Sequence, residues 1–360
     1  MLDIASRLFG NIYTPLNRIR LSEKNLQANY HYLSSLNPQI QVAPVLKSNA
    51  YGHGLTLIAK MIDKLHPPLI CVDSLYEAYE LFKLQINTPI LIIGYVNPEN
   101  LAIKSLPFSY AVFDEKTLRE IIKYQPQAKI HIFVDTGMHR EGITINQLPD
   151  FLANIKKYKN NIEGLMSHLA SNNEEQFTNF DRAQEIINNF DIKPKWIHLL
   201  NSSGLLHCKN FPHHKLGNLC RTGIALYDTK PVLKLVSQLV QIKKINKGDK
   251  IGYDCTFTAK KDMTIGILPI GYNDGVDRRL SNIGKVLIGK QVCPIIGRVS
   301  MNITTIDISK VNSPKIGQEV VVYSDNPKDV NSIDNVAKII GTIPYEILIH
   351  LHPSIRREVV

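Results

Sequence analysis

The sequence predicts an α/β fold in which a TIM-type (β/α)8 barrel precedes a C-terminal, mostly antiparallel β domain. Up to about residue 230, short apolar strands alternate with helical segments, the pattern of parallel βαβ units. Eight such units in succession fit a closed barrel better than a doubly wound open sheet. Beyond Leu233, short strands separated by turn residues follow one another with a single helical interruption, which is typical of an antiparallel sheet.

The elements expected from this pattern can be given in order. The barrel strands are apolar runs at about 41–47, 68–73, 89–95, 110–113, 129–135, 162–168, 196–200 and 218–221. The helices of the barrel are expected at about 22–36, 55–65, 75–83, 116–123, 148–158, 173–189 and from 203 onward. The second domain is expected to have strands at 236–243, 263–269, 285–288, 292–296, 303–308 and 319–323, and a helix near 333–340.

These elements divide the chain into two domains. We expect the barrel to comprise residues 14–232 and the β domain residues 233–360, with residues 1–13 grouped with the β domain. No GxGxxG motif follows any of the expected strands, which argues against a dinucleotide-binding fold.

Composition narrows the function classes. The net charge is +10, but the lysines and arginines are scattered, so we expect no nucleic-acid partner. No apolar run approaches the roughly 18 residues of a membrane span, so we expect no membrane association. Five cysteines without a CxxC or Cys/His pattern predict no metal site and a reducing compartment, which we take to be the cytoplasm.

Lys47 stands where an apolar run ends and a small polar loop begins. The surrounding segment, residues 44–54, reads PVLKSNAYGHG. An amine at the edge of an apolar environment loses solvation, which lowers its pKa and lets it react as a nucleophile with an aldehyde cofactor. The alternative is a solvated strand-end charge, and the position of Lys47 alone favours that alternative.

Other polar residues fall at the ends of the expected strands, where barrel enzymes place their chemistry. These residues are Lys47, Asp135, His168, Asn201, Ser202, Ser203, Arg221, Thr222 and Gly223. The loops after the seventh and eighth strands often bind phosphate in barrels, and both loops offer hydroxyls and backbone N–H groups here. A phosphate-bearing aldehyde cofactor is pyridoxal 5′-phosphate. Taken singly, His168 could be a core histidine, Arg221 an ion-pair residue and Asn201 only a helix cap.

With these residues in view, the sequence resembles the alanine racemase family over nearly its full length. Residues 45–54 resemble the family's cofactor-lysine signature, which is highly specific. The other matching segments are VDTGMHR (134–140), SHLA (167–170), NSS (201–203), RTGIALY (221–227), GYDCTF (252–257), PIGYNDG (269–275) and GRVSMN (297–302). The resemblance implies a fold-type III pyridoxal-phosphate enzyme that interconverts L- and D-alanine and supplies D-alanine for peptidoglycan. It also implies a head-to-tail homodimer with shared active sites.

The resemblance implies a catalytic role for four residues. Lys47 holds the cofactor as a Schiff base and acts as a base on one face of the substrate, and Tyr253 of the partner subunit acts on the other. His168 partners this tyrosine. Arg221 faces the pyridine nitrogen and, because it stays charged, leaves that nitrogen unprotonated.

The resemblance also implies binding roles. The cofactor-binding positions are Lys47, Tyr51, His168, Asn201, Ser202, Arg221, Gly223 and Ile224. Arg140 and the backbone of Met301 receive the substrate carboxylate, and Tyr272 lies at the substrate entry.

Three residues depart from the family pattern. Phe133 stands where many members carry a lysine, often carbamylated, that orients the arginine matched by Arg140. Asn302 replaces an aspartate. Pro353 stands where the family has a phosphate-binding tyrosine, and His352 is a candidate substitute. We expect these changes to alter affinity, rate or substrate range rather than the reaction.

Alternative functions remain open at the level of sequence. A racemase of serine or another amino acid is compatible with the departures. A fold-type III decarboxylase is less consistent, because those enzymes carry a cysteine where Tyr253 acts, although Cys255 is close by. A non-catalytic pyridoxal-phosphate carrier would lack the β domain.

Overall fold

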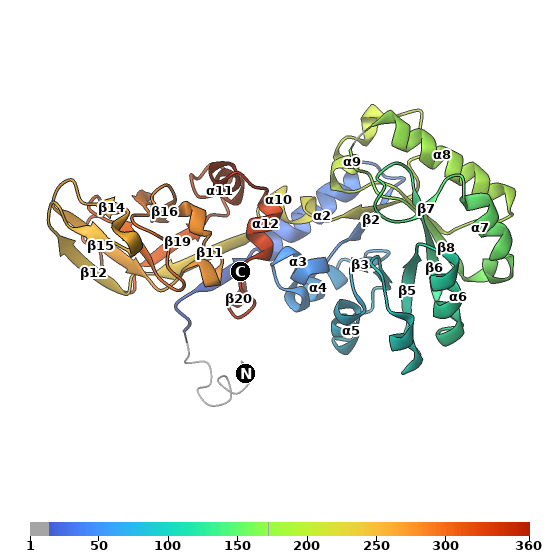
Figure 1. The fold of residues 1–360 in the computed structure, drawn as a ribbon, viewed down its shortest axis with the longest axis horizontal. Helices are drawn as coiled ribbons and strands as arrows, with labels where there is room; N and C mark the ends of the chain where they lie inside the picture. The colour runs from blue at the N-terminus through green and yellow to red at the C-terminus, as the bar shows by residue number, and fades with distance from the viewer. Residues whose placement is uncertain (1–13, 172) are drawn as a thin grey trace. The chain divides into compact units, whose positions relative to one another are not determined.

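The computed structural model describes residues 14–171 and 173–360 and confirms the barrel (Figure 1). Its strands are β2 (Gln41–Pro44), β3 (Ile70–Val72), β4 (Ile90–Ile92), β5 (Phe108–Val112), β6 (Lys129–Asp135), β8 (Ile162–Met166), β9 (Trp196–His198) and β10 (Leu219–Thr222). Neighbouring strands from β3 to β9 pair in parallel, and β10 pairs in parallel with β2. A parallel bridge from Val45 to Cys71 and a hydrogen bond from Arg221 N to Leu200 O (3.0 Å) close the ring.

The barrel helices lie outside the ring of strands (Figure 1). They are α2 (Glu23–Ser35), α4 (Leu55–Asp63), α5 (Leu75–Lys83), α6 (Glu115–Tyr124), α7 (Leu148–Asn154), α8 (Glu174–Asn189), α9 (Ser202–Leu206) and α10 (Ala225–Asp228). Ser74, Asp114 and Asn173 cap α5, α6 and α8, each accepting a hydrogen bond from the backbone three residues on. The connections contain β7 (Ile143–Thr144) and the 3-10 turns η2 (Pro98–Ala102), η3 (Lys156–Asn161) and η4 (Cys208–Asn210).

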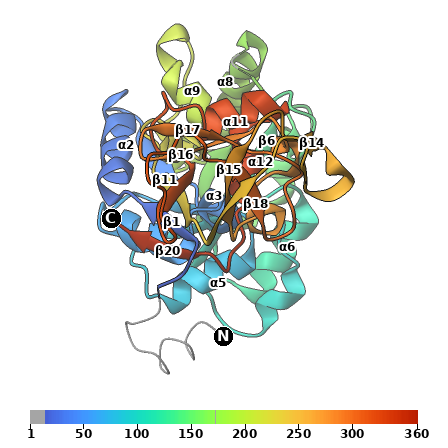
Figure 2. The ribbon, with the colours of Figure 1, turned by 90° about the vertical axis from the view of Figure 1, so that its left-hand side faces the viewer.

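The remaining strands form antiparallel sheets in a second compact unit (Figure 2). The largest sheet has the order β17 (Gln291–Pro294), β16 (Lys285–Ile288), β19 (Glu319–Tyr323), β11 (Leu233–Gln238), β1 (Arg18–Leu21) and β20 (Arg356–Val359), with β1 and β20 parallel. The smaller sheets are β12 (Gln241–Ile245) with β15 (Met263–Leu268) and β18 (Thr304–Asp307), and β13 (Lys250–Ile251) with β14 (Phe257–Thr258). The helical segments are α11 (Ile333–Ile340), α12 (Pro344–Ile349), η5 (Tyr253–Cys255), η6 (Tyr272–Asp274) and η7 (Arg278–Leu280).

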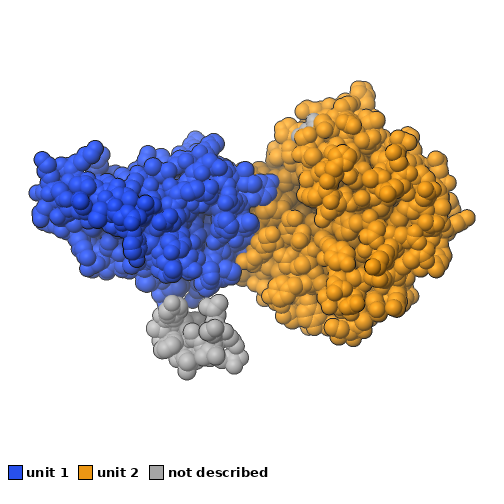
Figure 3. Space-filling model, viewed as in Figure 1, with its two compact units in different colours: residues 1–23, 52–54, 231–360 blue, residues 24–51, 55–230 orange. Residues whose placement is uncertain are grey.

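Contacts divide the described chain differently from the sequence near its start (Figure 3). Unit 1 comprises residues up to 23, 52–54 and 231–360, and unit 2 comprises 24–51 and 55–230. Residues 14–23, which the sequence analysis grouped with the barrel, lie in unit 1 because β1 pairs with β11 and β20. Ile19 and Leu21 are fully buried on one face of β1. The expectation that residues 1–13 belong with the β domain concerns residues that lie outside the described ones.

Two expectations within unit 1 were wrong in detail. The single strand expected at 236–243 is two strands, β11 and β12, in different sheets. The chain changes sheets at Leu239 and Val240, which donate hydrogen bonds to Gln318 and Ile267 respectively. Helix α12 was not expected. It starts at Pro344, whose fixed φ suits the first helical position.

Candidate active site

Lys47 begins a left-handed turn rather than ending a strand. The strand expected at 41–47 stops at Pro44, and α3 (Lys47–Tyr51) follows. Residues 48–51 all have φ between 52° and 56°, although none is glycine. Left-handed backbone is costly for such residues and persists only where surrounding bonds hold it. The side chain of Glu77 accepts from Ser48 N (2.6 Å), and the side chain of Asn49 accepts from Leu55 N (2.8 Å).

The Lys47 amine faces a carboxylate. Its Nζ lies 3.3 Å from Oδ1 of Asp73, just after β3, and the lysine side chain is 37% exposed. The sequence analysis had expected an apolar edge around this amine. The Asp73 carboxylate instead provides a counter-charge from the neighbouring strand end.

Arg221 and His168 meet at the same barrel end. Arg221 is buried and donates from Nη2 to His168 Nδ1 (3.3 Å) and to the carbonyl of Ser167. Burial, together with the positive charges of Arg221, Arg140 and Lys47, lowers the pKa of His168 to about 3. His168 is therefore neutral at pH 7. Since its Nδ1 accepts a hydrogen bond, its proton is on Nε2.

His198 is a further partner of Arg221 and was not expected from the sequence. Arg221 Nη1 donates to His198 Nδ1 (2.6 Å) and to its carbonyl oxygen (2.9 Å). His198 is fully buried at the end of β9. A polar residue in the otherwise apolar run at 196–200 was the signal that could have found it.

Tyr51, Ser202 and Gly223 form a cradle that fits a phosphate. Ser202 Oγ accepts from Gly223 N (3.0 Å) and Ala225 N (3.3 Å), so its hydrogen is available to donate. A Cβ on Gly223 would lie 2.1 Å from the Tyr51 hydroxyl, so only glycine lets that hydroxyl approach. Ile224 follows in the same turn and is largely buried. Hydroxyls beside backbone N–H groups suit a phosphate anion.

Asn201 behaves as the helix cap that sequence reasoning had kept as an alternative. Its Oδ1 accepts from Gly204 N (2.9 Å), and its Nδ2 donates to the carbonyl of Leu169 (3.2 Å). The side chain thereby fixes the start of α9 and, with it, the position of Ser202.

Arg140 and Phe133 have different surroundings. Arg140 is about half exposed, and its Nη2 lies 3.3 Å from Oε2 of Glu141. Phe133 is buried and packs with Ala111 and Met166. This apolar cluster provides no anion for Arg140, in keeping with the departure at position 133.

In unit 1, three loops that carry predicted residues adjoin one another. Tyr253 is 70% exposed, and within the described chain its hydroxyl has no hydrogen-bond partner. Asp254 in the same turn pairs with Arg298 (2.8 Å). The loop after Arg298 then meets the next one, since Tyr272 N donates to Ser300 O (3.0 Å).

Met301 and Asn302 complete this group. The carbonyl of Met301 accepts from Asn273 N (2.9 Å), and the Met301 side chain is 56% exposed. Asn302 Nδ2 lies 3.4 Å from Oδ2 of Asp274, so this amide contacts a carboxylate that a family aspartate would repel.

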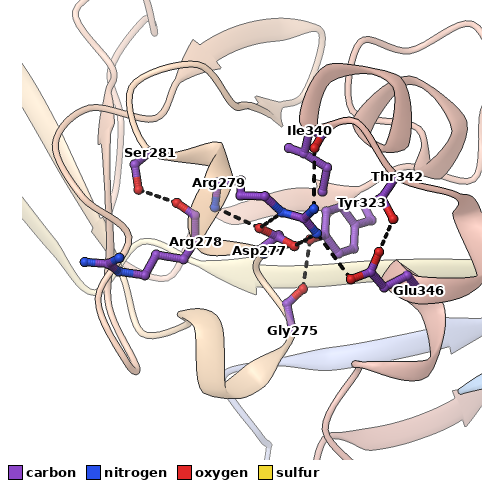
Figure 4. Close-up of polar contacts among 9 residues, drawn as sticks. All are labelled: Gly275, Asp277, Arg278, Arg279, Ser281, Tyr323, Ile340, Thr342 and Glu346. Carbon is purple, nitrogen blue, oxygen red and sulfur yellow. Dashed lines mark hydrogen bonds and ion pairs between the residues drawn. The ribbon is translucent and has the colours of Figure 1, made fainter.

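Ion pairs hold the loop that follows Tyr272 (Figure 4). Arg279 binds both oxygens of Asp277 (3.0 and 2.7 Å), and its Nη2 lies 3.5 Å from Glu346 on α12. Tyr323 on β19 donates to the carbonyl of Gly275 (2.8 Å).

Pro353 lies in a turn bound by a half-buried arginine. Arg357 donates to the carbonyl oxygens of Pro353 (3.2 Å), Ile355 (2.9 Å) and Gly52 (2.8 Å from Nη2). Burial lowers the pKa of Arg357 to about 10. The His352 imidazole is engaged by Ser354, with Nδ1 2.6 Å from its hydroxyl oxygen.

The described residues offer neither a metal cluster nor a membrane-spanning helix. Across 14–171 and 173–360, no group of three or more His, Cys, Asp or Glu residues is arranged to hold a metal ion. No helix in those same ranges has both the length and the apolarity to cross a bilayer.

Comparisons with known proteins agree with this architecture. The model of the alanine racemase N-terminal domain matches residues 21–231, and that of the C-terminal domain matches residues 232–359. An alanine racemase from Lactobacillus gasseri is 35% identical, with 90% of this chain and 92% of the relative covered. One from Sorangium cellulosum is 32% identical, with 88% and 91% covered.

Solved structures give the same result. Alanine racemase from Clostridium difficile 630 superposes with a TM-score of 0.89 at 27% identity, covering 97% of each chain. That from E. faecalis gives a TM-score of 0.86 at 27% identity, covering 96% of this chain and 98% of the other. A barrel with a lysine in the turn after its first strand and a phosphate cradle, followed by a β domain, defines the barrel class of pyridoxal-phosphate enzymes. Within that class, the chain belongs to the alanine racemase family.

Proposed function

We propose that this protein interconverts L- and D-alanine with pyridoxal 5′-phosphate, using Lys47 and the Tyr253 of a partner subunit as opposed bases. The observation that carries the proposal is the buried Arg221. It presents a permanent positive charge at a barrel end that also holds Lys47 and the phosphate cradle. A guanidinium opposite the ring nitrogen keeps that nitrogen unprotonated, which suits racemisation better than reactions needing a strong electron sink.

The residues divide the work of proton transfer. The bound cofactor supplies the electron-withdrawing group that makes the α-hydrogen of the amino acid acidic. Lys47 holds or releases a proton on one face, and Tyr253 does so on the other. His168 is neutral with its proton on Nε2, so it can donate a hydrogen bond to a phenolate and stabilise Tyr253 as a base.

Other residues bind and orient. The phosphate would be held by Tyr51, Ser202 and the turn at Gly223 and Ile224. Asn201 caps the helix that begins at Ser202 and so fixes the position of that serine. Arg140 and the Met301 backbone would receive the substrate carboxylate, and Tyr272 would border the entry.

The exposure of Tyr253 supports a shared active site. Its hydroxyl has no hydrogen-bond partner among the described residues of its own chain, as expected for a group that serves another subunit. We therefore propose a head-to-tail homodimer. The product D-alanine would serve peptidoglycan. A cytoplasmic location is supported by five cysteines that are all free thiols.

A second candidate is a racemase of serine or another amino acid. It is favoured by the apolar packing of Phe133 and by Pro353 in place of a tyrosine, since both change the polar surroundings of the predicted substrate site.

The test is to incubate the purified protein and cofactor with single L-amino acids and to separate the products by chiral chromatography. We expect D-alanine to form at the highest kcat/KM. Faster conversion of serine would select the second candidate, and no conversion of any amino acid would contradict both.

A further inference from the structure

A chain of polar side chains runs from the buried Arg221 through the barrel interior to the partly buried Glu163, near the opposite end of strand β8. Arg221 Nη1 contacts His198 Nδ1 (2.6 Å), and His198 Nε2 contacts His131 Nδ1 (2.7 Å). His131 Nε2 lies 3.3 Å from Oε2 of Glu163, whose carboxylate also accepts from Ser109 Oγ (3.0 Å). Each link joins neighbouring or near-neighbouring strands of the ring.

Only one arrangement of protons satisfies this chain. Arg221 can only donate, so His198 Nδ1 must accept, and the proton of His198 is on Nε2. His198 Nε2 therefore donates to His131 Nδ1, which puts the His131 proton on Nε2 as well. That proton points to Glu163, which accepts it as a carboxylate.

The charges at the two ends balance each other. Within 14–171 and 173–360, no carboxylate pairs directly with Arg221, although the guanidinium is buried. The two imidazoles are fully buried, and burial lowers the pKa of both. The hydrogen bond from His131 lowers the pKa of Glu163. Two neutral, polarised rings thus connect a cation to an anion.

The backbone beside Glu163 is shaped for this chain. Gly164 lies opposite His131 in the pairing of β6 with β8. A Cβ at position 164 would lie 2.2 Å from His131 Nδ1, so a side chain there would displace the ring. The glycine leaves the space in which His131 can join His198 to Glu163.

We propose that Glu163 is a positioning residue for Arg221. By accepting the last hydrogen bond, Glu163 fixes both histidines as Nε2–H tautomers and so keeps His198 Nδ1 as an acceptor for the guanidinium. If His198 took the other tautomer, its Nδ1–H would face an N–H of Arg221, and the guanidinium would move. If His131 took the other tautomer, its Nδ1–H would face His198 Nε2 and force the same change on His198. The consequence for catalysis rests on the proposed function, in which Arg221 faces the cofactor ring.

The first test does not need cofactor or activity. Nitrogen-15 NMR of the histidine rings reports the tautomer of each imidazole in the intact protein. We expect His131 and His198 to be neutral Nε2–H tautomers at pH 7. An Nδ1–H tautomer or an imidazolium at either position would overturn the proposal. The tautomers do not depend on which substrate the protein uses. A wrong assignment of the proposed function can therefore be distinguished from a wrong assignment of the hydrogen bonds between Arg221 and Glu163.

The second test compares substitutions of the acceptor. Glu163→Met removes it, and we expect both imidazoles to show mixed tautomers and kcat for alanine to fall about tenfold, with a smaller change in KM. Glu163→Gln retains an acceptor oxygen and should stay within about threefold of the wild type. The matched control is Ser109→Ala, which removes a hydroxyl from the same carboxylate but leaves the chain intact.

Comparing the tautomers and rates of these variants tests the role of Glu163 even if one variant folds poorly. Equal losses in Glu163→Gln and Glu163→Met, or wild-type tautomers and rates in both, would contradict the role of Glu163 as terminal acceptor. If Glu163→Met does not fold, wild-type tautomers with near-normal activity in Glu163→Gln support the proposal, and a loss larger than about tenfold in Glu163→Gln opposes it.

Discussion

Arg221 shows how a single residue sets the electrostatics of the barrel end. Its guanidinium is buried and contacts two histidines, His168 and His198, on opposite sides. Burial disfavours the imidazolium form of both rings, and the neighbouring cation adds to this effect, so both rings stay neutral and act as directed donors and acceptors. Each histidine is thus kept neutral by its burial and, in addition, by the charge of Arg221.

Acid should destabilise the protein through these buried histidines. The pKa of His168 is about 3 in the folded protein, whereas an unfolded histidine has a pKa near 6.5. Between these values the unfolded chain binds more protons, so stability present above pH 6.5 is lost as the pH falls toward 3. Urea unfolding of the cofactor-free protein at several pH values measures this.

Replacing His168 by asparagine should reduce that pH dependence. His213 is exposed, so His213→Asn serves as the matched control and should leave the slope unchanged. A slope in His168→Asn as steep as in the wild type would contradict the buried, neutral state of His168.

Lys47 should be required for covalent attachment of the cofactor. We expect Lys47→Ala to lose the visible absorbance band of the lysine-bound cofactor, because no amine remains at that position. Lys83→Ala is a control, since Lys83 lies in the same unit on α5 and pairs with Glu80. Retention of the band in Lys47→Ala would contradict the assignment.

At the scale of elements, short segments are shaped by bonds from distant parts of the chain. The turn at residues 48–51 keeps four left-handed residues, and the side chain of Glu77 accepts a hydrogen bond from its first backbone N–H, at Ser48. In unit 1, the turn at Gly52 is crowded by the carbonyl of Leu348, where a Cβ would lie 1.9 Å away. Neither constraint is visible in a local sequence window.

Arg279 should hold the loop that carries Tyr272. In Arg279→Met the pairs with Asp277 and Glu346 are lost (Figure 4), so we expect a lower melting temperature and a higher KM for the amino acid with little change in kcat. Differential scanning calorimetry and steady-state kinetics measure these quantities.

The neighbouring Arg278 provides the control. Among the described residues it forms no ion pair, and its side chain points away from Asp277 in Figure 4. Arg278→Met should therefore leave the melting temperature near that of the wild type. Equal effects of the two substitutions would show that the ion pairs do not anchor the loop.

At the scale of the whole molecule, the two predicted bases belong to different compact units. Lys47 lies in unit 2 and Tyr253 in unit 1. In the proposed dimer each active site combines Lys47 of one subunit with Tyr253 of the other, so activity depends on assembly.

Mixing two inactive variants should restore activity. A heterodimer of Lys47→Ala and Tyr253→Phe contains one site with both bases intact. Random exchange at equal concentrations makes half the dimers mixed, so about one quarter of wild-type activity should return. Exchange is verified by native mass spectrometry, and mixing either variant with itself is the control. Confirmed heterodimers without activity would contradict shared sites.

The sequence determined the barrel and much of the β domain because those features are periodic. Apolar runs separated by helical patterns give the order of strands, and Arg221 lies at a strand end as expected. Lys47 and His168 follow strands that end earlier than expected, at Pro44 and Met166. The cradle residues Ser202 and Gly223 were found for the same reason, since they follow neighbouring strands of the ring.

Only the tertiary structure decided which side chains meet. Residues far apart in the sequence, such as Glu163, His131 and His198, form one hydrogen-bonded chain because the barrel curls their strands around a common interior. The pairing of β1 with β20 likewise joins the two ends of the described chain. The spacing of apolar residues along the sequence predicts which face of a helix or strand is apolar. The partner of a buried polar group depends on strand register and closure, which are properties of the whole fold.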